Sequence, residues 1–265
     1  MTAVLGIDVG GSKIAAGLVD TGTGAVEQEA RCATPTDGGA GVLAAAVDLA
    51  ASLAAERVPI GIGICELVDP NGAITSAFTI DWRGLDVAAG FADIGGPIRI
   101  ESDVRAAARA EASFGAGRLY SDFLYISVGT GISYAHVLNG QPRRGARGNA
   151  IIVGAPPVED VASGRALEHR AGAQRAEDVL ANPAQRTLVE DAARSLGLAV
   201  AALVNAIDPE ALVVGGGLGL NDSYRALVEA TARPAIEVET TRALPIVPAA
   251  LGGRSGVVGA ALAAV

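Results

Sequence analysis

Residues 4–19 of this chain read VLGIDVGGSKIAAGLV. Two short apolar stretches are joined by a turn with paired glycines, and this pattern is typical of a β-hairpin. Paired glycines let backbone N–H groups turn inward and surround an anion, so the turn is a candidate phosphate site. The alternative is an ordinary tight turn, because the chain has 35 glycines and a Gly-Gly pair is common by chance.

Lys13, at the end of this turn, is the only lysine of the chain. Its compact ammonium and the neighbouring Ser12 hydroxyl suit a phosphate group, and the carboxylate of Asp8 can hold a hydrated Mg²⁺ ion. We therefore expect a specific function for this lysine.

The composition excludes several classes of protein. A chain of 265 residues can form one large domain or two modest ones, and we favour two that share a cleft. A net charge of −9 without a basic stripe argues against a nucleic-acid partner. Two cysteines (Cys32, Cys65) and two histidines (His136, His169) exclude a disulfide framework and a four-cysteine zinc site. Without a secretory signal or an apolar run of roughly 20 residues, we expect a cytoplasmic protein with no membrane partner.

The spacing of apolar residues predicts strands and helices in alternation, and therefore an α/β fold. The first half is predicted to add an antiparallel strand at 25–33, a helix at 39–56, strands at 60–64 and 98–100, and a helix at 104–114. In the second half, strands at 123–128 and 133–138 flank Gly129-Thr130-Gly131 and repeat the first hairpin, which indicates an internal duplication. The remaining predicted elements are helices at 161–171 and 185–207, a strand at 211–214 and a terminal helix at 257–265.

Two further positions are candidates for function. Gly215-Gly216-Gly217 follows the strand at 211–214, and missing side chains there leave room for a nucleotide base. Asp103 follows the strand at 98–100 and opens a helix. The same position also suits an ordinary helix N-cap, for which Ser102 is a second candidate.

Five segments of the chain, in this order, resemble the ROK family of sugar kinases: residues 5–20, 101–118, 125–140, 159–164 and 205–219. The resemblance implies an actin-like ATPase (ribonuclease H-like) fold, in which two α/β domains surround a cleft that binds ATP and sugar. We expect a small domain at 1–115, a large domain at 116–252, and a C-terminal helix at about 253–265 that packs back on the small domain. The family also favours a homodimer.

The resemblance assigns roles to particular residues. It implies that ATP and Mg²⁺ bind at two phosphate segments and that adenosine lies beside a third glycine segment. Asp103 matches the catalytic base, and Glu159 matches a sugar-binding glutamate. The implied cofactor-binding residues are Asp8, Gly10, Gly11, Ser12, Lys13, Gly129, Thr130, Gly131, Gly215, Gly216 and Gly217.

The acceptor side departs from the family pattern. Gly148-Asn149-Ala150 lacks the Glu-x-Gly-His that usually follows, and the zinc-binding cysteine loop is missing, so we expect no structural metal. Glu66 stands where glycine is usual, and Ser102 replaces an asparagine. Phe78, four residues before Trp82, replaces a second asparagine. We therefore expect a rebuilt acceptor pocket formed by Glu66, Ser102, Asp103 and Glu159.

These features predict an ATP-dependent kinase that phosphorylates a primary hydroxyl of a sugar, amino sugar or cyclitol. Ionised Glu66 and Glu159 would favour an acceptor with an amine or several hydroxyl donors over glucose, unless Glu66 points to solvent. The alternatives are a non-catalytic sugar-binding or regulatory protein and a plain ATPase. A DNA-binding repressor is disfavoured, because the repressor members of the family carry an N-terminal helix-turn-helix arm, whereas this sequence begins inside its first strand.

Overall fold

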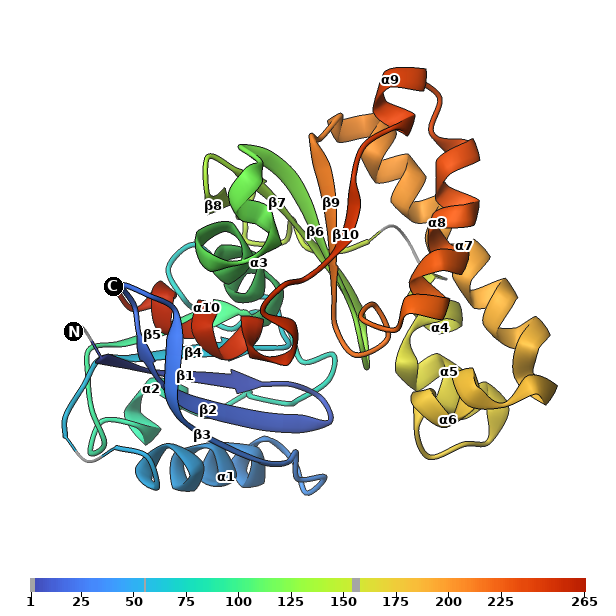
Figure 1. Cartoon of the computed structure of the whole chain (residues 1–265). Helices are drawn as coiled ribbons and strands as arrows, with labels where there is room; N and C mark the ends of the chain where they lie inside the picture. Colours follow the sequence, from blue (N-terminus) through green and yellow to red (C-terminus); the bar gives the residue numbers. More distant parts are fainter. Residues whose placement is uncertain (1–2, 55, 154–157) are drawn as a thin grey trace.

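The computed structural model describes residues 3–54, 56–153 and 158–265, and it confirms the α/β class with two five-stranded sheets (Figure 1). The first sheet has the order β3-β2-β1-β4-β5. Its first three strands are antiparallel, while β4 and β5 run parallel to β1. The strands are β1 (Ala3–Val9), β2 (Lys13–Asp20), β3 (Ala25–Ala33), β4 (Ile60–Ile64) and β5 (Ile98–Ser102).

The second sheet repeats the plan of the first. Its order is β10-β9-β6-β7-β8, and a hairpin of β6 and β7 again precedes two strands parallel to the first. This agreement supports the duplication that the repeated glycine hairpin indicates. The strands are β6 (Asp122–Val128), β7 (Ile132–Leu138), β8 (Gln141–Pro142), β9 (Ala211–Gly215) and β10 (Ile246–Pro248).

Two helices, α3 (Asp103–Phe114) and α10 (Ser255–Ala263), lie between the sheets (Figure 1). One face of α3 packs on the second sheet, while Ala110 joins α10 and the first sheet in another apolar cluster. The small residues of α10 permit a close approach, since a Cβ atom on Gly259 would collide with the Ala106 carbonyl. The chain therefore returns at its end to cover the sheet with which it began.

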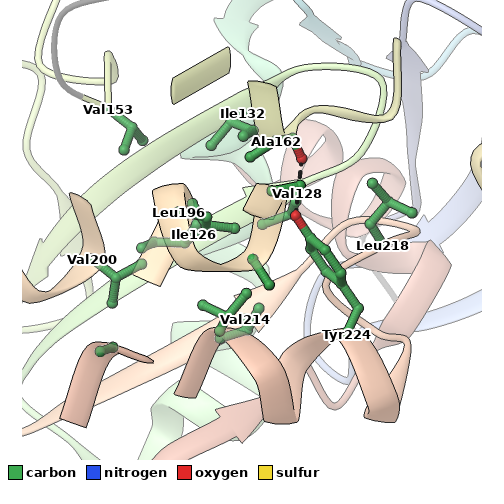
Figure 2. Close-up of a cluster of buried hydrophobic side chains, with 14 of the residues drawn as sticks. Ile126, Val128, Ile132, Val153, Ala162, Leu196, Val200, Val214, Leu218 and Tyr224 are labelled. Atoms are coloured by element: carbon green, nitrogen blue, oxygen red, sulfur yellow. Dashed lines mark hydrogen bonds between the residues drawn. The ribbon is translucent and has the colours of Figure 1, made fainter. Parts of the chain in front are cut away.

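The outer faces carry the other helices. On the first sheet α1 (Gly39–Ala51) buries Val42, Ala46 and Ala50. On the second sheet α7 (Arg186–Ile207) and α8 (Asp222–Ala235) form the largest core, in which the buried Tyr224 hydroxyl donates to the Ala162 carbonyl over 3.1 Å (Figure 2). The shorter helices are α2 (Val87–Gly90), α4 (Val158–Ala162), α5 (Gly164–Ala171), α6 (Ala176–Ala181) and α9 (Glu239–Arg242), and 3₁₀ turns span Ala116–Leu119, Pro183–Gln185 and Gly252–Arg254.

Several predicted boundaries were wrong. The helix predicted at 39–56 ends at Ala51, where the Ser52 hydroxyl donates to the Leu49 carbonyl. The helix predicted at 161–171 is divided, because Ser163 caps α5 by accepting the Ala166 N–H. Helix α8 was not predicted at all. Across the described ranges, no helix is long and apolar enough to cross a membrane.

Candidate active site

The turn between β1 and β2 is closed by its own backbone. The Gly10 N–H donates to the Lys13 carbonyl over 3.0 Å, and the Thr34 hydroxyl donates to the Gly10 carbonyl over 2.7 Å. The side chains of Ser12 and Lys13 remain exposed. Hydrogen bonds therefore hold the backbone of the turn, while the Ser12 hydroxyl and the Lys13 ammonium are accessible at the end of the hairpin.

The corresponding turn of the second sheet meets the first one. Between β6 and β7 the Gly129 N–H donates to the Gly131 carbonyl over 2.9 Å. The hydroxyl oxygens of Ser12 and Thr130 lie 2.7 Å apart. The two glycine turns, far apart in sequence, thus face each other across the two halves of the molecule.

The third glycine segment lies beside the second turn. Gly216 has a φ of +80°, and a Cβ atom there would collide with the backbone of Val128. The N–H groups of Leu218 and Gly219 both donate to the Val128 carbonyl. A Cβ atom at Gly217 would find its nearest neighbour, a Glu177 carboxylate oxygen, only at 3.9 Å. A Cβ atom at Gly215 would collide with the Tyr125 hydroxyl, so of these three glycines Gly217 is the one with open space beside it.

Asp103 occupies the first position of α3, and its side chain does not act as a cap. Ser102 is the N-cap residue, and no side-chain capping bond is made within the described residues. The Asp103 Oδ1 atom accepts the N–H of Val104 over 2.6 Å. The structure thus disfavours the N-cap interpretation of this carboxylate.

Asp8 and Asp103 are close enough to repel each other. Burial raises the pKa of Asp103 to about 7, with a further increase from the negative charge of Asp8, while the Val104 N–H opposes the shift. Burial also raises the pKa of Asp8 to about 6, although Lys13 lowers it. Two carboxylates with raised pKa values beside the glycine turn of β1 and β2 are a suitable environment for a divalent cation, which would favour their ionised forms.

Glu66 does not have the role that we predicted for it. Its carboxylate is 2% exposed and accepts the N–H groups of Phe78, Thr79 and Ile80, at 2.9, 2.6 and 2.8 Å, together with the Ser76 hydroxyl. These four donors occupy the lone pairs of both oxygens. The carboxylate therefore neither points to solvent nor has capacity for an acceptor amine, and we reassign it to the support of the 76–80 loop.

The prediction that Ser102 binds the substrate also needs correction. It is fully buried, and its hydroxyl oxygen lacks a hydrogen-bond partner among the described residues. A side chain enclosed by the protein does not line an accessible acceptor surface. Of these two neighbouring residues, Asp103 is the one that is only partly buried.

Glu159 lies in the first turn of α4, next to the second glycine turn. A Cβ atom added to Gly131 would lie 2.8 Å from a Glu159 carboxylate oxygen. Partial burial raises the pKa of Glu159, and Arg165 lowers it. Residues 154–157, where the family pattern breaks off, lie outside the described residues.

Arg105 is a central residue of the site that sequence reasoning missed. It is fully buried, with Nε donating to Glu101 over 2.7 Å, Nη1 to the Gly148 carbonyl over 2.7 Å and Nη2 to the Val68 carbonyl over 2.8 Å. Arg144 donates to the other Glu101 oxygen over 2.8 Å. The first turn of α3 is thereby tied to the loop that contains Gly148 and to the loop that contains Val68. The i,i+4 spacing of Glu101 and Arg105 was a visible signal, but the two carbonyl partners had none.

In the part of the chain that the structure describes, no three His, Cys, Asp or Glu side chains are grouped to hold a metal. We therefore expect a chelator to leave the melting temperature unchanged, because the described loops contain no ligand cluster through which zinc could fix their shape. Thermal unfolding with and without EDTA, together with elemental analysis of zinc, tests this. A stoichiometric zinc whose removal unfolds the protein would contradict the prediction. Activity is unsuitable as a readout, because chelators also remove Mg²⁺ from ATP.

Comparison with known proteins identifies close relatives. The model of the ROK family matches residues 4–265. A glucokinase of Streptomyces coelicolor is 32% identical over 317 aligned positions, covering 98% of this chain and 97% of the relative. An N-acetylmannosamine kinase of Haemophilus influenzae is 30% identical, with coverages of 97% and 93%. A solved ROK family glucokinase from Streptomyces griseus, in complex with glucose and AMPPNP, superposes with a TM-score of 0.82, 29% identity and 99% coverage of both chains.

Proposed function

The chain belongs to the ROK family, and from this we propose that it is an ATP-dependent kinase that phosphorylates a hydroxyl of a sugar or sugar-like acceptor. It has the actin-like ATPase fold of the ROK sugar kinases to which it is similar. The observation that carries the proposal is the meeting of the two glycine turns, with Ser12 and Thr130 in contact. A regulatory role without catalysis is less well supported, because Asp103 and Lys13 are both retained.

In this proposal the two turns hold the phosphates of ATP and Gly215–Gly217 borders adenosine. Backbone N–H groups at glycine turns are suited to phosphate oxygens. Lys13 supplies a mobile positive charge beside the first turn. The carboxylate of Asp8 would hold a hydrated Mg²⁺ ion, which neutralises charge on the phosphates during transfer.

Asp103 is proposed as the general base. Its Oδ1 atom is engaged by the Val104 N–H, while no donor to Oδ2 is found in the described residues. Oδ2 is therefore available to accept the acceptor hydroxyl proton as the oxygen attacks the γ-phosphorus and the bond to the β-phosphate oxygen breaks. Glu159, beside the second turn, is proposed to bind the acceptor.

We further propose that the chain forms two domains. The small domain comprises residues 1–115 and the helix at about 253–265, and the large domain comprises residues 116–252. The two domains close over the substrates and exclude water. A homodimer and a cytoplasmic location are proposed from the family resemblance and from the need for ATP. Sedimentation analysis and cell fractionation would test these two points.

Activity is expected to fall as the pH is lowered, because only ionised Asp103 can accept a proton. Its pKa of about 7 in the free protein predicts a kcat/KM for the acceptor that declines about tenfold per pH unit on the acidic side. Bound Mg²⁺ would move the midpoint lower. A pH profile at saturating MgATP checks this, and a flat profile from about pH 5 to 8 would be inconsistent with Asp103 as the base.

Replacement of Lys13 with arginine is expected to raise the KM for ATP by about tenfold or more and to lower turnover. The turn is crowded, since a Cβ atom on Gly11 would lie 2.9 Å from Thr79 and 3.4 Å from Thr130 side-chain carbons. A planar guanidinium on a longer side chain does not place its charge and its donors where a compact ammonium does. Steady-state kinetics with varied ATP measure the effect. Unchanged kinetics would reduce Lys13 to an ordinary surface residue.

The direct test is a screen of acceptors. Purified protein is incubated with MgATP and neutral sugars, amino sugars or cyclitols, and phosphorylated products are detected by mass spectrometry. A product that forms only with both ATP and one acceptor class supports the kinase proposal. ATP hydrolysis that no acceptor stimulates would indicate a plain ATPase, and acceptor binding without turnover would favour the regulatory alternative.

A further inference from the structure

Arg165 is attached to the second glycine turn by its backbone. It is the second residue of α5, and its N–H donates to the Thr130 carbonyl over 3.2 Å. The preceding Gly164 donates to the Gly129 carbonyl over 2.7 Å, and a Cβ atom on Gly164 would lie only 2.8 Å from that oxygen. The start of this helix therefore has a fixed position relative to the turn.

The side chain of Arg165 extends to the other glycine turn. A Cβ atom built on Gly11 would lie 3.6 Å from the Arg165 Nη2 atom. Arg165 comes from the second half of the chain and Gly11 from the first. The guanidinium of Arg165 consequently lies where the two turns face each other.

This guanidinium is not committed to a protein partner. Arg165 is exposed, and among the described residues its side chain makes no hydrogen bond or ion pair, although its charge lowers the pKa of nearby Glu159. Arg144 and Arg233, by contrast, each bind a carboxylate. A cation in the first turn of a helix also opposes the helix dipole, so its position is unfavourable for stability of α5 alone.

We propose that Arg165 is a further phosphate-binding residue, which contacts the γ-phosphate of ATP between the two turns. The inference rests on the proposed kinase function, and it adds a second cationic side chain to the phosphate site that contains Lys13. A planar guanidinium can donate two parallel hydrogen bonds to phosphate oxygens. It would stabilise negative charge on the transferred group and link both turns when ATP is bound.

The test compares two nucleotides that differ in the γ-phosphate. Binding of Mg²⁺-AMPPNP and Mg²⁺-ADP is measured by calorimetry for wild-type protein, Arg165→Met and Arg165→Lys. We expect Arg165→Met to weaken AMPPNP binding by about tenfold or more with little change for ADP, and Arg165→Lys to recover part of the loss. The kcat for the acceptor found by screening should fall in the same order. Arg170→Met, at the other end of α5, is the matched control and should behave as wild type in both measurements.

The outcomes separate this inference from the proposed function. Equal weakening for both nucleotides, or none for either, would overturn the role of Arg165 and leave the kinase proposal intact. Wild-type protein that binds neither nucleotide would overturn both. Thermal unfolding of each variant confirms that the exposed substitution has not changed the fold.

Discussion

Replacement of Asp103 with asparagine is expected to lower kcat by ~10²–10⁴-fold while the protein still folds and binds ATP. Asparagine keeps the shape of the side chain but does not accept a proton from the attacking hydroxyl. Single-turnover measurements of product formation, together with calorimetric binding of AMPPNP, separate the two effects. Asp222→Asn, in the first turn of α8, is the control and should retain full activity. Transfer within a few-fold of wild type would end the assignment of Asp103 as the base.

The same variant should alter the pH dependence of stability. Burial raises the folded-state pKa of Asp103 from 3.8 to about 7, so the folded protein retains a proton that the unfolded chain releases between about pH 4 and 7. The contribution of Asp103 to wild-type stability therefore decreases as the pH rises through this window, and it is smallest above pH 7. Asp103→Asn should have a higher free energy of unfolding than wild type at about pH 8, and the difference should shrink toward pH 4. Urea unfolding at several pH values measures it.

Replacement of Arg105 with methionine is expected to reduce the free energy of unfolding by about 3–5 kcal/mol, because one partner of a buried ion pair is removed. The Gly148 and Val68 carbonyls would lose their buried donors, and Glu101 would keep, among the described residues, Arg144 and the Ser102 N–H. Urea unfolding provides the measurement. If the variant folds, the KM for the acceptor should rise more than the KM for ATP, since the loops that contain Gly148 and Val68 are expected to form the acceptor side.

Two variants make this prediction specific. Arg83→Met removes an arginine from an exposed pair with Asp81 and should have little effect on unfolding, because exposed ion pairs contribute little. Arg105→Lys keeps the charge but cannot reach three acceptors with one planar group, so an intermediate loss is expected. A loss for Arg105→Met as small as that for Arg83→Met would show that the buried network does not stabilise the protein.

The fold was largely predictable because its signals are local. Apolar runs and glycine turns lie within short windows of sequence, and the same hairpin pattern occurs once in each sheet. Helix ends were less accurate, since the break at Ser163 depends on a cap and on contact between Gly164 and the second turn. Helix α8 was not predicted, although its buried residues Tyr224, Val228 and Ala232 recur at helical spacing.

The sequence by itself determined the two glycine hairpins and the position of Asp103 at a strand-to-helix junction, because each depends on residues adjacent in the chain. Only the tertiary structure decided the partners of Glu66, the anchoring by Arg105 and the approach of Arg165 to Gly11. The burial of a charged group and the donors around it depend on segments that meet only after folding. The same glutamate in an open loop would be solvated, whereas here the returning 76–80 loop supplies four donors and fixes its role.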